Sequence, residues 1–170
     1  MDARPEAGVA GCRLIKENGE IISHVRRYPT IVDQLAIVLK LPHLFPFVLD
    51  KYLYRDFDYN QEAEVDSVRG SFFMIRREVI EKLGGLDERY FIWFEEVDFC
   101  RQAKNAGWKI MYAPTVKCID YVGKSFAQVR RGKTQEYFRD SMLKYFKKWH
   151  HIWQYLFLRL AWPIGMFIAR

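Results

Sequence analysis

The stretch YFIWFEEVDFC, residues 90–100, places three carboxylates among aromatic and sulfur side chains. Charged side chains are rarely buried unless a partner compensates them. The stretch therefore predicts one of two structures: a helix start with a solvated acidic face, or a site where carboxylates border a dry pocket. The helix itself is predicted over residues 94–106, ended by Gly107.

Helical spacing separates the three acids. In a helix that begins near Phe94, Glu96 shares a stripe with apolar residues, whereas Glu95 and Asp98 fall on a polar stripe that is solvated or paired with Arg101. Burial would raise the pKa of Glu96 and the helix N-terminus would lower it. An ionised but poorly hydrated carboxylate suits a general base. The alternative is ordinary complementarity between acidic residues and the helix dipole.

The rest of the chain predicts a mixed α/β protein. Turn residues, apolar spacing and glycine positions indicate a hairpin over 11–25, a helix over 31–39, an irregular segment over 43–60, a strand over 64–75 bulged at Gly70, a helix over 76–83, strands over 108–113 and 115–122, and helices from residue 134 onward.

Several motifs occur in a fixed order: RGSFFMIRREV, GGLDERYF, FEEVDFCRQAKNAGW and APTVKCIDYVGKS. In this order they resemble the family-two glycosyltransferases, most closely the rhamnosyltransferase-like branch. The resemblance covers roughly residues 8–126. It implies an α/β fold of the GT-A type, here an incomplete mixed sheet without the N-terminal nucleotide-binding βαβ region. It also implies inverting transfer of a sugar from a nucleotide-sugar donor to a hydroxyl acceptor, in cell-envelope polysaccharide or glycolipid synthesis.

The resemblance also implies roles for particular residues. Glu96 corresponds to the carboxylate that deprotonates the acceptor hydroxyl, so it is the predicted catalytic residue. Gly70 and Ser71 would line the cleft, and Glu95 and Asp98 would complete the substrate-binding set. For Gly70, a simple bulge is the alternative.

Asp120 stands where the family usually has a histidine that helps to hold a metal and the donor diphosphate. A carboxylate oxygen suits Mg²⁺ or Mn²⁺ at least as well as imidazole does. The resemblance therefore implies a divalent cation as cofactor, with Asp120 as a ligand. An exposed acid at a strand end is the alternative.

The C-terminal part is basic and then apolar. Between Lys124 and Lys148 there are eight basic and two acidic residues, an excess equal to the net charge of +6 for the whole chain. An aromatic-rich apolar run follows. We expect two parts, an acceptor-side transferase domain over 1–126 and an amphipathic helical tail over 127–170. We expect the tail to bind an anionic membrane surface, which places the protein in the cytoplasm, peripheral on the inner face of the cytoplasmic membrane. A terminal helix packed on the core is the alternative.

Other features limit the remaining functions. Cys12, Cys100 and Cys118 lack the spacing of a zinc site or of a disulfide framework, and no apolar run typical of a signal peptide is visible near Met1. No nucleic-acid-binding motif accompanies the basic block, so nucleic acid is not an expected partner. The expected partners are a nucleotide-sugar donor, a glycan or lipid-linked acceptor and a separate nucleotide-binding half. A non-catalytic fragment or membrane-associated scaffold without a donor site stays open.

Overall fold

A computed structural model describes residues 1–121, 123 and 131–168. Within these residues, four strands form one mixed sheet in the order β2-β4-β1-β3. The long strands β1 (Ala7–Ile15) and β4 (Lys109–Ile119) are parallel neighbours in the centre. Two short strands, β2 (Ala63–Glu64) and β3 (Met74–Ile75), pair antiparallel with them at the edges.

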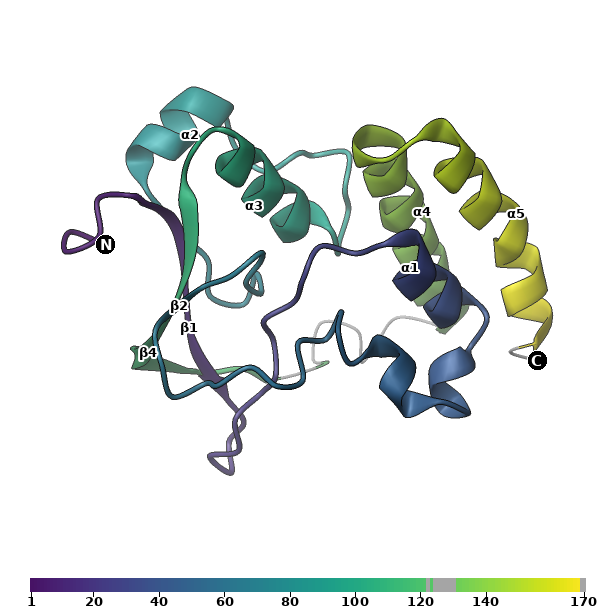
Figure 1. Cartoon of the computed structure of the whole chain (residues 1–170), viewed down its shortest axis with the longest axis horizontal. Helices are drawn as coiled ribbons and strands as arrows, with labels where there is room; N and C mark the ends of the chain where they lie inside the picture. The colour runs from purple at the N-terminus through teal and green to yellow at the C-terminus, as the bar shows by residue number, and fades with distance from the viewer. Residues whose placement is uncertain (122, 124–130, 169–170) are drawn as a thin grey trace.

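A first hydrophobic core lies between this sheet and the helices α2 (Arg77–Leu83) and α3 (Glu95–Asn105), which lie near one another in Figure 1. Phe99, Cys100 and Ala103 of α3 are fully buried in this core. Gly11 of β1 permits a close approach, because a Cβ atom there would lie 2.6 Å from Cβ of Val68. The segment that carries residues 67–69 therefore lies directly against the sheet.

A second core joins helices from distant parts of the sequence. It lies between α1 (Ile31–Val38), α4 (Arg131–Trp149), α5 (Ile152–Ile168) and the N-terminal end of α3. The helices α1, α4 and α5 gather at one end of the molecule (Figure 1), where the 3₁₀ turns η1 (Leu41–His43) and η2 (Pro46–Leu49) follow α1. α1 begins at a capping box in which Thr30 and Asp33 bind each other's backbone N–H groups.

α5 packs on α1 through Gly165. A Cβ atom at this position would lie 2.1 Å from the carbonyl oxygen of Val38, so the two backbones touch where a larger residue could not fit. The buried face of α5 also contains Leu158 and Ala161. The predicted division at residue 126 stays a prediction, although α4 and α5 share a core with α1 and α3.

The predicted α/β class, with a mixed sheet consistent with a partial GT-A-type domain and C-terminal helices, is confirmed. The predicted hairpin is present around its turn, where Ile15 bridges Ile21 and the N–H of Ile22 donates to the carbonyl of Leu14, but its return arm forms no longer strand. Three local predictions are wrong. Residues 64–75 form turns between two short strands, and Gly70 lies in a turn, not a bulge. The two strands around Pro114 are one strand, β4, whose register against β1 shifts between Ala113 and Lys117.

A buried ion pair fastens α4 to α3. Asp98 of α3 has no exposed surface, and its carboxylate accepts hydrogen bonds from Nζ of Lys148 at 2.7 Å and from the indole N–H of Trp149. The side chains of Tyr90 and Gln102 donate two more. The prediction that Asp98 lies on a solvated stripe or pairs with Arg101 is therefore wrong, because α4 covers that side of α3.

We expect Lys148→Met to lower the free energy of unfolding by about 3–5 kcal/mol, because it leaves the Asp98 carboxylate buried without its cation. Asp98→Asn in the same chain should restore much of the loss by removing the stranded charge. Urea denaturation followed by circular dichroism measures both effects.

Lys147→Met is the matched control, because Lys147 is an exposed neighbour on the same helix. It should change stability by less than about 0.5 kcal/mol. Equal and small effects of the two lysine substitutions would show that the ion pair does not hold α4 in place.

Candidate functional site

The backbone is strained just before α3. Trp93 and Phe94 have φ angles of 61° and 67°, a left-handed conformation that bulky residues rarely adopt. Phe94 is the N-cap residue, and its side chain is buried against Phe138 and Tyr145. Packing of these aromatic rings compensates the strain, which is typical of functional sites. Glu95 and Glu96 are the first two residues of the helix that follows.

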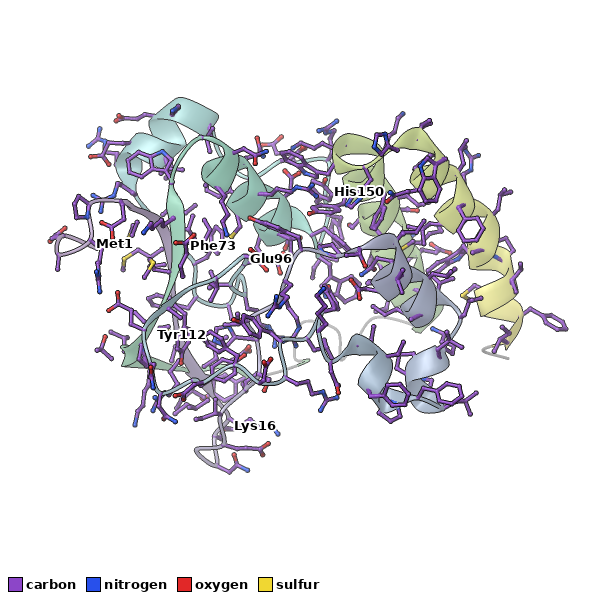
Figure 2. All side chains as sticks on the ribbon, viewed as in Figure 1. Met1, Lys16, Phe73, Glu96, Tyr112 and His150 are labelled. Carbon is purple, nitrogen blue, oxygen red and sulfur yellow. The ribbon has the colours of Figure 1, made fainter. Side chains whose placement is uncertain are left out.

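Five of the six predicted site residues line one pocket of about 300 Å³, which we call the acidic pocket. Glu95 and Glu96 come from the start of α3, and Asp120 follows β4. The exposed turn of Gly70 and Ser71 forms another wall. Figure 2 shows Glu96 in the middle of the molecule, between the sheet and the helical end. The structure therefore brings together residues that are up to 50 positions apart in the sequence.

Glu96 combines burial with a shortage of partners. Burial is the main cause that raises the pKa of Glu96 to about 7, and the neighbouring charge of Glu95 raises it further. Arg69 and the N–H groups at the helix start oppose the rise. One oxygen, Oε2, is inaccessible to solvent and finds no hydrogen-bond partner among the described residues. A carboxyl group with this pKa can accept and return a proton near neutral pH.

Glu95 shows the same tendency. Burial raises its pKa, and its Oε2 atom also lacks a partner within the described part of the chain. Two adjacent carboxyl groups in one pocket disfavour simultaneous ionisation, and the charge of Glu95 accordingly raises the pKa of Glu96.

The opposite wall of the acidic pocket is a small polar network. Oγ of Ser71 donates a hydrogen bond of 2.9 Å to Oδ2 of Asp120, and Nε of Arg69 lies 3.4 Å from the same oxygen. Asp120 is fixed by its backbone N–H, which donates to the carbonyl of Ile15. Arg69 thus contacts Asp120 and lines the acidic pocket together with Glu96.

This wall supplies one carboxylate, that of Asp120, to the predicted metal site. Across residues 1–121, 123 and 131–168, no cluster of three histidine, cysteine, aspartate or glutamate side chains could hold a metal ion. Mg²⁺ is commonly bound through one or two carboxylates together with substrate phosphates. Asp120 and the Ser71 hydroxyl fit such a substrate-bridged cation and do not form a complete cage.

Asp98 does not open on the acidic pocket. Its carboxylate is enclosed by Tyr90, Gln102, Lys148 and Trp149. We propose that it positions α3 against α4 and does not contact substrate. Helical phase alone could not reveal this, because it does not show which other element covers the polar stripe.

Sequence reasoning did not single out the residues of a second pocket behind Glu96. This inner pocket of about 260 Å³ is lined by Glu96, Trp93 and Phe138 together with three basic side chains, His24, Arg26 and Arg69. Burial lowers the pKa of His24 to about 4, so its ring is neutral at pH 7. The motif RGSFFM could have pointed to Arg69, because this residue immediately precedes the predicted site residue Gly70.

Comparison with curated proteins gives three informative relatives. The chain is 27% identical over 122 residues to N-acetylglucosaminyl-diphospho-decaprenol L-rhamnosyltransferase of Mycobacterium tuberculosis, a match that covers 71% of this chain and 39% of that protein. It is 26% identical over 97 residues to rhamnosyltransferase WbbL of Escherichia coli K12, covering 57% and 34%. It is 36% identical over 55 residues to low-salt glycan biosynthesis hexosyltransferase Agl10 of Haloferax volcanii, covering 32% and 18%.

The chain therefore spans about two fifths of the length of the first of these relatives. No solved structure matches it. The family model described as glycosyltransferase like family 2 matches residues 39–139, which include both walls of the acidic pocket. This match extends over more than half of the sequence, and with it the chain belongs to glycosyltransferase like family 2.

Proposed function

We propose that this chain is the acceptor-side part of an inverting glycosyltransferase that uses a nucleotide-sugar donor. The observation that carries the proposal is Glu96, a half-buried carboxyl group with a pKa of about 7 on the wall of a polar pocket. The rhamnosyltransferase relatives support sugar transfer in cell-envelope glycan synthesis. A nucleotide-binding part outside residues 1–170 would complete donor binding. It would belong either to the same polypeptide or to a separate one.

In the proposed reaction, Glu96 takes the proton from the acceptor hydroxyl. The hydroxyl oxygen then forms a bond to the anomeric carbon of the donor sugar, on the face opposite the nucleotide diphosphate, which departs with the electron pair. One displacement of this kind inverts the anomeric configuration. Burial of Glu96 keeps its carboxylate poorly hydrated and therefore basic.

Arg69, together with a cation held by Asp120, would compensate the negative charge of the leaving diphosphate. The guanidinium of Arg69 lies against Asp120 and lowers the pKa of Glu96, so it can move its interaction from a carboxylate to a diphosphate oxygen. A divalent cation, when bound, would neutralise the diphosphate and would be held by Asp120 and Ser71. Gly70 and Glu95 would border the substrate at the mouth of the pocket.

A surface of apolar side chains supports membrane association. α5 exposes a stripe in which Leu160 is 73% and Phe167 is 76% exposed, and the 3₁₀ turns expose Leu44 and Phe47 at the same end of the molecule (Figure 1). Exposed apolar surface of this extent marks an interaction site. Among the described residues, no helix is both long and apolar enough to cross a membrane. We propose that α5 lies in the membrane interface on the cytoplasmic face.

The basic residues of α4 contribute less to this binding than their number suggests. Four of them already have partners within the protein: Lys133 with Glu136, Arg139 with Asp140, Lys144 with the carbonyl of Arg89, and Lys148 with Asp98. The three ion pairs and one hydrogen bond within the protein leave these cations less free to contact lipid headgroups. The apolar stripe of α5 is therefore the main source of the proposed affinity.

Replacing Glu96 by Gln at the native gene locus should reduce sugar transfer in isolated membranes by about 10²–10⁴-fold, because the amide cannot accept the hydroxyl proton. Expression at the native locus keeps any nucleotide-binding part of the system in place. Glu88→Gln, in the exposed loop before α3, is the matched control and should keep full activity. Near-normal transfer by Glu96→Gln would remove Glu96 from the proposed role.

The contribution of Glu96 to the stability of the chain should fall as pH rises from about 5 to 8. The folded-state pKa of Glu96 is about 7 and its ordinary value is 4.5, so the folded protein binds more protons than the unfolded protein across this window. Glu96→Gln cannot lose this proton. Its melting temperature should exceed that of the wild type at pH 8 and approach it at pH 5. Parallel pH profiles would contradict the assigned pKa.

Leu160→Glu combined with Phe167→Glu should abolish most sedimentation of the chain with anionic vesicles, because both changes place a charge on the exposed stripe of α5. Ile80→Glu makes the same chemical change at an exposed apolar position on α2, far from the stripe, and should leave binding intact. Raising the salt concentration should weaken binding only modestly. Equal binding by the wild type and the double variant would exclude α5 as the membrane-facing element.

A further inference from the structure

A third cavity lies among the helices and belongs to neither pocket at the carboxylates. This apolar cavity has a volume of about 270 Å³ and lies between α1, α4 and α5. Its walls are mainly hydrocarbon and aromatic, with one cation, and include Ile37, Val38, Lys40, Trp93, Phe138 and Trp162. Such a wall is unsuited to a sugar, whose hydroxyl groups would lose their hydrogen bonds to water without replacement.

The apolar cavity adjoins the catalytic carboxylate. Trp93 and Phe138 line both this cavity and the inner pocket that contains Glu96, and their ring centroids lie 6.0 Å apart. Trp93 also lines the acidic pocket. The two aromatic rings therefore border both a polar space at Glu96 and an apolar space at the helical end.

The other side of the cavity is formed by the element that carries the exposed apolar stripe. Trp162 belongs to α5, and the close contact of Gly165 with Val38 fixes α5 against α1 beside the cavity. The order in space is thus apolar surface, apolar cavity and carboxylate. A molecule with a hydrocarbon chain at one end and a hydroxylated head at the other would match this order.

We propose that the apolar cavity binds the head-proximal isoprenoid segment of a lipid-linked acceptor while the acceptor sugar lies at Glu96. This inference rests on the proposed function and deepens it by assigning the acceptor's lipid a site. The volume lies near the lower limit of about 300–1,000 Å³ for ligand pockets, so the cavity holds a segment of the chain and the remainder stays in the membrane.

Lys40 supplies the charge that such an acceptor requires. It lines the cavity, and no carboxylate forms an ion pair with it within the part of the chain that the structure describes. A phosphate group attached to the lipid in this cavity would meet this cation. The backbone at Lys40 has a φ angle of 60°, so Asn, which tolerates this conformation, is the conservative replacement that removes the charge.

The test measures binding of farnesyl diphosphate to the full chain by calorimetry, below the micellar concentration of the probe and without vesicles. The wild type should bind saturably, and Ile37→Trp, which fills the cavity from α1, should weaken binding at least tenfold. Val32→Trp is the matched control, because Val32 lies on α1, is 65% exposed and does not line the cavity. Gln135→Phe fills the same cavity from α4 and serves if Ile37→Trp does not fold.

Two further arms separate the parts of the proposal. Lys40→Asn should weaken farnesyl diphosphate but not farnesol, which lacks the phosphates. Glu96→Gln should keep full affinity for the probe, so a failure of the proposed catalysis is distinguishable from a failure of this site. Absence of saturable binding by the wild type, or equal binding by Ile37→Trp and the wild type, overturns the proposal. A loss in Val32→Trp as large as in Ile37→Trp also overturns it.

Discussion

The helical end of this protein depends on one buried negative charge. This charge is the carboxylate of Asp98, which has no solvent exposure. A buried carboxylate must be matched by donors, and here Lys148 and Trp149 at the end of α4 provide them. Docking α4 in this way places Phe138 of the same helix beside Phe94 and Trp93. The inner pocket and the apolar cavity both use that contact as a wall. The geometry around Glu96 thus follows from an interaction two residues further along α3.

The opposite treatment of two carboxyl groups on the same helix is instructive. Asp98 is buried and supplied with a cation and three uncharged donors. Glu96 lies at the helix start with one oxygen that has no partner among the described residues, and its pKa rises to about 7. Full satisfaction fixes a charge in place, whereas partial satisfaction leaves a group ready to exchange a proton. We therefore propose that these two carboxylates, separated by a single residue in the sequence, serve structure and chemistry respectively.

Sequence reasoning identified Glu96 because two different signals agree there. The 3.6-residue period places it on the core-facing stripe, and motif order places it in the acidic position of the family. Gly70, Ser71 and Asp120 were found from motif order alone, and their gathering around one pocket required the β1–β4 pairing. The same helical period gave the wrong surroundings for Asp98. The period shows which face of a helix is polar, but it does not show that another helix, here α4, covers that face. The predicted strand over residues 64–75 was wrong for a related reason. Its sequence favours a strand, but β2 pairs with β4 at only two positions and β3 pairs with β1 at only two.

α3 is shared by both hydrophobic cores, since Phe99 and Ala103 belong to the sheet side and Phe94 and Val97 to the helical side. This arrangement has an evolutionary consequence. The helical end, which shapes the apolar cavity, can diverge while the sheet stays constant, provided that a cation still reaches the depth of Asp98. Aspartate at 98 and lysine at 148 should then be inherited or lost together, and a chimaera that imports the C-terminal helices of another family member would have to import its half of that pair.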